Sequence, residues 1–156
     1  LLSLLEGKHL SRAELELIAR EMARHEPLLR KVRLSPPDET EIEAAAVLLH
    51  SFYNGVENIF KSIANHIDET RLTSTGWHRE LLNLMARAVP QRPAVLSPEL
   101  YESLEGYMGF RHIFRHAYYF EFKWSKMKDL VEKVEDTHRR FCDEINAFLT
   151  AMAARS

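Results

Sequence analysis

Apolar side chains recur every three or four residues along most of the chain, which is the spacing of one face of an α-helix. The longest run covers residues 40–68, directly after Pro36 and Pro37, and Asp38 or Thr40 can cap its start. Its apolar positions are Ile42, Ala45, Leu49, Phe52, Val56, Phe60, Ile63 and Ile67. No segment alternates apolar and polar residues with a period of two. The pattern therefore predicts an all-α fold, a four- to five-helix bundle.

A first helix is expected before this run, over about residues 11–33. Ser11 and Glu14 have the spacing of a capping box, in which a serine side chain accepts the backbone N–H three residues later. Pro27 lies inside the apolar pattern, where proline removes a helical hydrogen bond. A kink or a break near His25 is therefore expected.

Three more helices are expected in the second half of the chain. A short one covers about residues 77–89, and Ser-Pro-Glu at residues 97–99 starts the next, with serine as the cap and proline in the first turn. The last covers about residues 125–151. The aromatic segment 118–124 between these two helices is expected to cap one end of the core.

Two features of the long helix require an explanation. Gly55 lies in its middle, where glycine costs about 1 kcal/mol relative to alanine, so it is expected to mark a close contact with another helix or with a second subunit. His50 and His66 are expected to be structural, because buried histidines commonly do no more than form hydrogen bonds.

The composition suits one globular domain, which is expected to cover residues 1–156. The formal net charge is only −2, so any site for a polyanion must be a local patch rather than the whole surface. The single cysteine, Cys142, excludes an internal disulfide and fits a reducing compartment, so a cytoplasmic location is expected. No apolar run reaches the roughly 18–20 residues that cross a bilayer, and the leucine-rich start lacks the features of a signal peptide.

The residue types most suited to chemistry gather in residues 110–119, Phe-Arg-His-Ile-Phe-Arg-His-Ala-Tyr-Tyr. Arg111 and Arg115 are four residues apart, and so are His112 and His116, so each pair shares one side of a helix. The segment contains no acidic residue, whereas solvated helix faces usually mix both signs of charge. Guanidinium, imidazole and phenol groups on one packed helix can bind and cut a phosphodiester.

A metal site in this segment is not expected. His112 and His116 have the spacing that lets two imidazoles share an ion, but the arginines beside them oppose a cation and no acidic third ligand is near in sequence. A metal or redox site of the bundle type repeats Glu-x-x-His on facing helices. Glu135 and His138 have that spacing on the last helix, and no clear second copy faces them.

Arg111, His116 and Tyr118 form the sequence Arg-x4-His-x-Tyr, which resembles the motif of HEPN-domain ribonucleases of the HepT type. The likeness spans about residues 40–150, and the segments that carry it besides the motif are residues 48–60, 76–82 and 92–96. The first of these is similar to the central helix of HepT-like proteins. The resemblance implies an HEPN-like up-and-down bundle.

The resemblance also implies a function. HepT-like proteins are toxins that cut RNA without a metal ion or another cofactor, usually as homodimers with both motifs at a shared cleft. Each is paired with an MNT-type minimal nucleotidyltransferase antitoxin, which silences it by adding AMP to the motif tyrosine. By position that tyrosine is Tyr118, next to Tyr119.

Residue chemistry gives each group an expected role. His116 is the candidate general base for the ribose 2′-hydroxyl, since imidazole exchanges protons near neutral pH. Arg111 is the candidate ligand of the scissile phosphate. Arg115 and His112 are expected to contact RNA, and Tyr118 to orient the site or stack on a base. The expected product is a 2′,3′-cyclic phosphate, and either a partner-chain histidine or water protonates the leaving oxygen.

The helix geometry leaves two arrangements open. On one continuous helix Arg111 and His116 lie about 140° apart, so they do not face the same phosphate. Either the helix ends near Arg115 and His116 turns back, or a second chain completes the site, as in a two-fold dimer.

A different class of function remains as an alternative. The same helical fold accompanies nucleotidyltransferases as a non-catalytic binding module or antidote, and a fold alone does not fix a function. Complex formation with a nucleotidyltransferase in the absence of RNA cleavage distinguishes this alternative from the ribonuclease.

Overall fold

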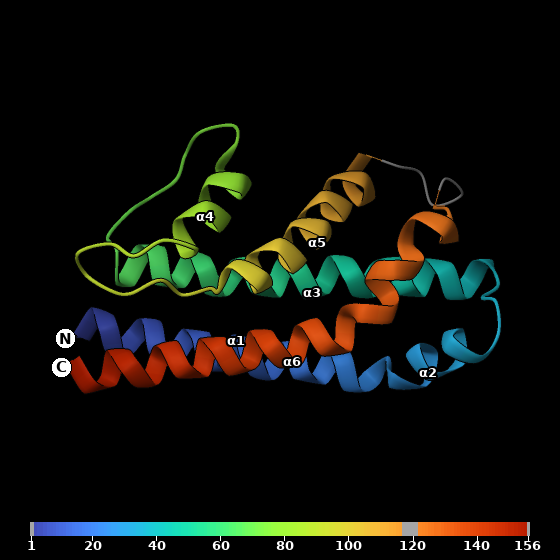
Figure 1. Ribbon diagram of the computed structural model, residues 1–156, viewed down its shortest axis with the longest axis horizontal. Helices are drawn as coiled ribbons and strands as arrows, with labels where there is room; N and C mark the ends of the chain where they lie inside the picture. The colour runs from blue at the N-terminus through green and yellow to red at the C-terminus, as the bar shows by residue number, and fades with distance from the viewer. Residues whose placement is uncertain (1, 117–121, 156) are drawn as a thin grey trace.

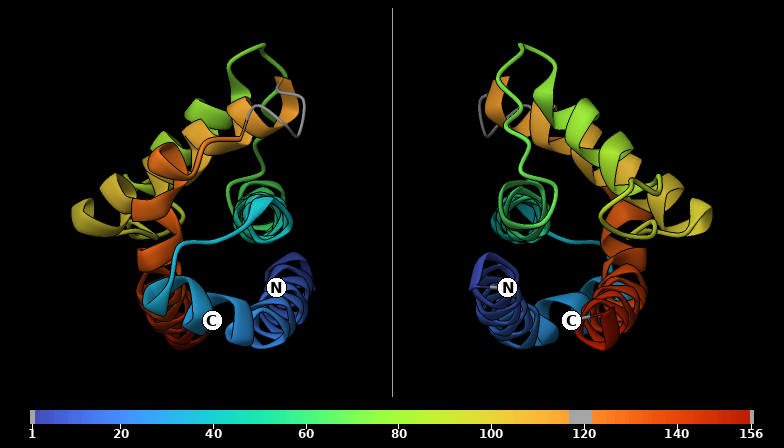
Figure 2. Two further views of the ribbon diagram at one scale, coloured as in Figure 1. Left: turned by 90° about the vertical axis from the view of Figure 1, so that its right-hand side faces the viewer. Right: turned by 90° about the vertical axis from the view of Figure 1, so that its left-hand side faces the viewer.

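The computed structural model describes residues 2–116 and 122–155 of the chain (Figure 1). Its helices are α1 (Leu2–Arg24), α2 (Glu26–Leu34), α3 (Glu39–His66), α4 (Trp77–Met85), α5 (Pro98–His116) and α6 (Trp124–Arg155). The long helices α1, α3, α5 and α6 run in alternating directions, and both termini lie at the same end (Figure 1). Figure 2 shows the other helices arranged in an arc around one side of α3. This arrangement confirms the predicted all-α, up-and-down bundle.

The predicted first helix is two helices, which is why the described residues contain six instead of four or five. His25 separates α1 from α2, and Pro27 lies in the first turn of α2, as the proline rule requires. The predicted start at Ser11 is wrong. Helix α1 already begins at Leu2, and Ser11 is fully buried inside it. The Ser3 hydroxyl donates a 2.7 Å hydrogen bond to the carbonyl of His66, which docks the first turn on α3.

Helix α3 forms the centre of the core, as its pattern predicts. Seven of its eight predicted apolar positions are buried and Ile42 is partly buried. The Asp38 side chain accepts the backbone N–H of Glu41 at 2.8 Å, and the Glu41 carboxylate accepts the backbone N–H of Asp38 at 3.0 Å. Asp38 is therefore the cap, in a complete capping box.

Gly55 lies where α3 meets α1, so the close contact is one between helices of the same chain. A Cβ added at Gly55 lies only 2.5 Å from Cγ1 of Ile18, whereas a Cβ at Gly109 of α5 meets nothing within 4 Å. We expect Gly55→Ala to lower the free energy of unfolding by about 1–3 kcal/mol through overpacking. Gly109→Ala is the matched control and should raise it by up to about 1 kcal/mol.

Urea denaturation of the two glycine variants measures both effects. Adding Ile18→Ala to Gly55→Ala removes the clashing atoms, so the two changes together should cost less than the sum of the separate changes. A strictly additive double variant would contradict the proposed contact.

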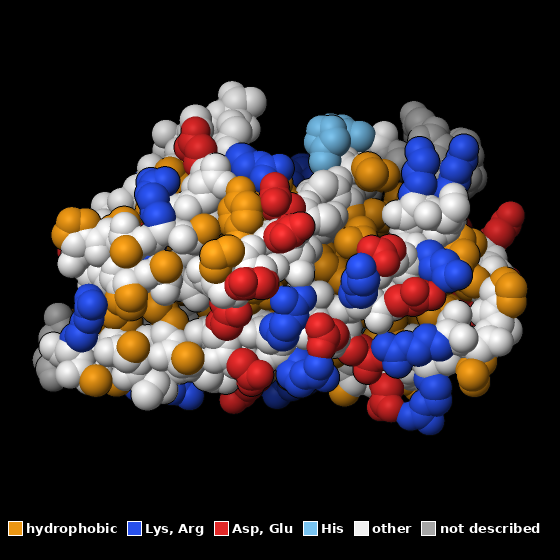
Figure 3. All heavy atoms as spheres, in the orientation of Figure 1, with side chains coloured by type: hydrophobic (Ala, Val, Ile, Leu, Met, Phe, Trp, Pro, Cys, Tyr) orange, Lys and Arg blue, Asp and Glu red, His pale blue; other side chains and the backbone are white. Residues whose placement is uncertain are grey.

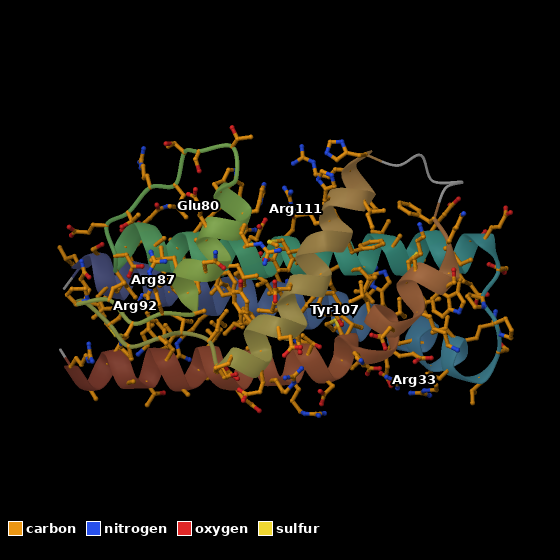
Figure 4. The ribbon with its side chains drawn as sticks, turned by 45° about the horizontal axis from the view of Figure 1, so that its top comes forward. Arg33, Glu80, Arg87, Arg92, Tyr107 and Arg111 are labelled. Carbon is orange, nitrogen blue, oxygen red and sulfur yellow. The ribbon has the colours of Figure 1, made fainter. Side chains whose placement is uncertain are left out.

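A buried ion pair joins the ends of α3 and α4 to the loop before α5. Arg92 is fully buried, and its Nε and Nη2 groups donate to the Asp68 carboxylate at 2.7 and 2.8 Å. The same guanidinium donates to the carbonyls of Leu84, Arg87 and Pro93 at 2.9–3.1 Å. Figure 4 shows Arg87 and Arg92 near each other beside the end of α4. This loop fixes where α5, and with it the basic segment, begins.

The start of α5 follows the predicted pattern. The backbone N–H of Leu100 donates to the Ser97 hydroxyl at 3.1 Å, and Ser97 also bonds the Glu144 carboxylate of α6 through its hydroxyl and backbone N–H. At the other end of α5, the rings of Phe110 and Phe114 pack on Phe122. The remaining residues of the predicted aromatic cap, 118–121, lie outside the described residues, whereas Phe122 and Trp124 do pack against the core.

Two histidines packed against core rings make stability depend on pH. Burial lowers the pKa of His50 below its usual 6.5, and the charges of Arg111 and Arg115 lower it further. Burial also lowers the pKa of His138 below 6.5. The unfolded chain therefore takes up protons at a higher pH than the folded protein, and stability should fall as the pH drops through 6.5.

The free energy of unfolding should change by at most about 1.4 kcal/mol per pH unit for each histidine. Urea denaturation at a series of pH values from neutral to mildly acidic measures it. His50→Phe keeps the ring stacked on Phe114 and should flatten the slope, while His9→Gln on the exposed side of α1 is the control. Equal slopes for wild type and His50→Phe would contradict a contribution from His50.

Candidate functional site

The basic segment lies on an unbroken stretch of α5. The helix continues through His116, and the rings of His112 and His116 lie 4.5 Å apart, as residues four apart on a helix do. The alternative in which the helix ends near Arg115 and His116 turns back is therefore wrong. Arg111 and His116 of one chain point about 140° apart.

The predicted site residues divide into one inward-facing residue and three exposed ones. Arg111 lies largely buried between α4 and α5 (Figure 4). His112, Arg115 and His116 are exposed, and Figure 3 shows histidine side chains standing out from the surface near the end of α5. Tyr118 lies outside the described residues.

Arg111 is held by two residues that the sequence pattern does not single out. Its Nε lies 3.4 Å from Oε1 of Glu57, an ion pair that lacks hydrogen-bond geometry. Its Nη1 lies 3.3 Å from Nε2 of His78. Glu57 comes from α3 and His78 from α4, so three helices meet at this guanidinium.

The shortest contact among Glu57, His78 and Arg111 is the one between Glu57 and His78. Nδ1 of His78 lies 2.7 Å from Oε2 of Glu57, and the Glu57 side chain is only 3% exposed. A carboxylate accepts, so Nδ1 carries the proton and Nε2 is left with a lone pair toward Arg111. The Trp77 ring packs against the imidazole with 3.6 Å between centroids, and Lys61 lies over Trp77. The imidazole is therefore held at both its carboxylate contact and its ring face.

His78 and Arg111 line a pocket of about 230 Å³ between the start of α4 and the second half of α5. Its polar walls are His78, Arg79, Arg111 and His112, and two glycines, Gly76 and Gly109, leave its edges open. Arg79 is paired with Glu105 at 2.5 Å. Two arginines and two histidines thus lie along the pocket, and their side chains are of the kinds that bind phosphate in proteins.

Three buried polar atoms, on Arg111 and on two residues that feel its charge, have no hydrogen-bond partner within the described part of the chain. They are Oη of Tyr53, Nδ1 of His50 and Nε of Arg111. Residues 50, 53 and 57 lie on the face of α3 that packs toward α5. Burial and the Glu57 charge raise the pKa of Tyr53, which keeps its phenol neutral. Unpaired buried polar groups are costly, so their gathering here is typical of a functional site.

Glu57 and His78 were missed because their partners lie far away in sequence. One signal was present for Glu57: it lies four residues after Tyr53 and three before Phe60, inside the apolar stripe of α3. A charge at such a position predicts a buried partner. Nothing in the sequence around His78 indicates its contacts.

Two further findings concern the described residues. No three of their histidine, cysteine, aspartate and glutamate side chains lie close enough together to hold a metal ion. None of the helices among them has the length and apolar character needed to span a bilayer.

Comparison with known proteins gives one clear result. The family described as HepT-like protein matches residues 44–152, more than two thirds of the chain, from near the start of α3 nearly to the end of α6. The matched region contains Glu57, His78, Arg111 and His116. No curated protein and no solved structure gives a significant match. On the family match and the helical bundle together, the chain belongs to the HepT-like protein family.

Proposed function

We propose that the protein is a metal-independent endoribonuclease and the toxin of a HEPN/MNT toxin–antitoxin pair. The observation that carries the proposal is Arg111, the motif arginine, which lies in a pocket and is oriented from behind by Glu57 and His78. A guanidinium fixed in this way suits the recognition of a planar or tetrahedral oxyanion.

Arg111 would bind the scissile phosphate. Its Nε and Nη1 groups face Glu57 and His78, and no hydrogen bond joins Nη2 to any described residue. Nη2 is therefore available to a phosphate oxygen, and Arg115 adds an exposed positive charge one turn later on α5. Such a local patch attracts RNA even though the net charge of the chain is −2.

The general base would come from a second copy of the chain. Because α5 is continuous through His116, this imidazole faces solvent while Arg111 of the same chain faces the pocket. In a two-fold homodimer, His116 of the partner subunit meets the phosphate held by Arg111. It takes the proton of the ribose 2′-hydroxyl, the 2′-oxygen attacks phosphorus, and a 2′,3′-cyclic phosphate forms.

Tyr118 is the proposed site of regulation. It follows the exposed His116 by two residues, and addition of AMP there by an MNT-type nucleotidyltransferase would place a phosphate and a nucleoside beside the catalytic imidazole. The added phosphate is an anion that competes with RNA for the arginines. Silencing by modification of this tyrosine follows from that competition.

RNA cleavage in the presence of EDTA tests the proposed function. The wild-type protein, purified without a nucleotidyltransferase, should cut RNA and leave 2′,3′-cyclic phosphate ends, and His116→Ala should lower the rate by about 10²- to 10⁴-fold. His9→Ala on α1 is the matched control and should cut like wild type. Intact RNA after incubation with folded, unmodified, dimeric wild-type protein would contradict the proposal.

A further inference from the structure

We propose that His78 is a second catalytic histidine, which donates a proton from Nε2 to the leaving 5′-oxygen, with Glu57 as its positioning residue. This inference rests on the proposed ribonuclease function and completes the reaction, since His116 supplies only the base. It concerns two residues outside the Arg-x4-His-x-Tyr motif, 21 positions apart in sequence and joined by a 2.7 Å contact.

The contact distances around Glu57 show whether its carboxylate orients the His78 imidazole or only forms a buried ion pair with Arg111. The carboxylate lies 2.7 Å from His78 Nδ1 but 3.4 Å from Arg111 Nε, where hydrogen-bond geometry is absent. Glu57 therefore orients the imidazole more strongly than it holds the guanidinium. A buried carboxylate on one imidazole nitrogen of a histidine that lines a pocket is the arrangement of acid–base histidines.

The position of His78 places Nε2, the nitrogen that does not contact Glu57, beside any phosphate that Arg111 holds. Nε2 lies 3.3 Å from Arg111 Nη1, and the His78 side chain is 25% exposed where it lines the pocket. An oxygen bound to that guanidinium is within hydrogen-bond reach of Nε2 or one small shift from it. No other hydrogen bond joins Arg111 to a histidine among the described residues.

Binding of the phosphate prepares His78 as the acid. Without substrate, the lone pair of Nε2 accepts an N–H of Arg111. A phosphate that takes over this N–H frees the lone pair, which then takes up a proton from solvent. The Glu57 carboxylate and the phosphate then offset the positive charges of the imidazolium and of the Arg111 guanidinium, whose Nη1 lies 3.3 Å from Nε2.

The two histidines approach the phosphorus from opposite sides, as an in-line displacement requires. His78 lines the pocket in one protomer, and His116 of the partner subunit, a residue exposed on α5, would come from the solvent side. In the step, the 2′-hydroxyl proton passes to His116, the bond from the 2′-oxygen to phosphorus forms, and the bond from phosphorus to the 5′-oxygen breaks. The proton of His78 Nε2 passes to that 5′-oxygen, and solvent restores both imidazoles.

A leaving group that needs no proton tests this role. Two short RNAs with the same mapped cleavage site are compared, one natural and one in which sulfur replaces the bridging 5′-oxygen, because a thiolate leaves without protonation. His78→Gln should slow cleavage of the natural RNA by about 10²- to 10³-fold and that of the sulfur-bridged RNA by less than about tenfold. His116→Ala should slow both RNAs alike, and His9→Gln neither.

Glu57→Gln tests the positioning role in the same assay. It should show the same selective loss on the natural RNA, with a smaller size than in His78→Gln, because the imidazole remains but its orientation is lost. Circular dichroism and urea denaturation verify that each variant is folded, and His78→Asn provides a second variant should His78→Gln fail to fold.

The outcomes are distinct. Equal losses on both RNAs in His78→Gln, or no loss on either, would overturn the assignment of His78 while the ribonuclease function stands. A folded wild-type dimer that cuts neither RNA would remove the ribonuclease function and the role of His78 together. Selective loss on the natural RNA supports both.

Discussion

Replacing Arg111 with lysine should lower kcat/KM for RNA cleavage by about 10²- to 10³-fold, the usual effect of removing a fixed donor from a developing oxyanion. Lysine keeps the positive charge but loses the planar fork that allows Arg111 to contact Glu57, His78 and a phosphate at once. The loss should appear mainly in kcat, because the charge that attracts RNA remains.

Initial rates at several RNA concentrations separate the two parameters. Arg12→Lys, at an exposed position of α1, is the matched control and should behave like wild type. A folded Arg111→Lys variant with wild-type kcat would show that the fork has no part in the chemistry. A variant changed only in KM would restrict Arg111 to general attraction of RNA.

The largest effect on stability is expected at Arg92. Arg92→Met leaves the Asp68 carboxylate buried without its partner and removes the donors to three backbone carbonyls. The free energy of unfolding should fall by about 3–5 kcal/mol, the usual cost of breaking a buried ion pair from one side. Urea denaturation gives the value, and Arg30→Met, which breaks the exposed ion pair with Glu26 on α2, should cost less than about 1 kcal/mol.

A double-mutant cycle shows how much of the loss belongs to the buried carboxylate. Adding Asp68→Asn to Arg92→Met should cost little more than Arg92→Met alone, since asparagine carries no charge. Additive losses in the cycle, or a loss below about 1 kcal/mol in Arg92→Met, would contradict the view that this pair holds the loop before α5.

Local rules explain the parts of the fold that the sequence predicts well. Burial of one helix face produces the periodicity of α3, and proline at position 27 breaks the first helix because it lacks an N–H. The caps at Asp38 and Ser97 depend only on residues three positions away. The prediction at Ser11 failed because a capping pattern occurs by chance within a helix, and the docking of Ser3 on His66 is a long-range contact.

The candidate site is predictable only in part, for the same reason. Arg111 follows from a short motif, but the residues that orient it lie 33 and 54 positions earlier, on α4 and α3, and no local pattern connects them. The sequence also left open whether α5 ends before His116. The helix is continuous through His116, so Arg111 and His116 of one chain lie on different sides of α5, and under the proposed function a homodimer would bring His116 to the Arg111 of its partner.

Cleavage by mixed dimers is the most direct test of whether Arg111 of one chain and His116 of another form one catalytic site. Arg111→Lys and His116→Ala proteins, each nearly inactive, are combined in equal amounts, unfolded and refolded, and native mass spectrometry counts the heterodimers. Each heterodimer has one site with both groups intact, so cleavage should recover to roughly a quarter of the wild-type rate. A mixture that contains heterodimers but cuts no faster than the separate variants would contradict a site shared between two chains.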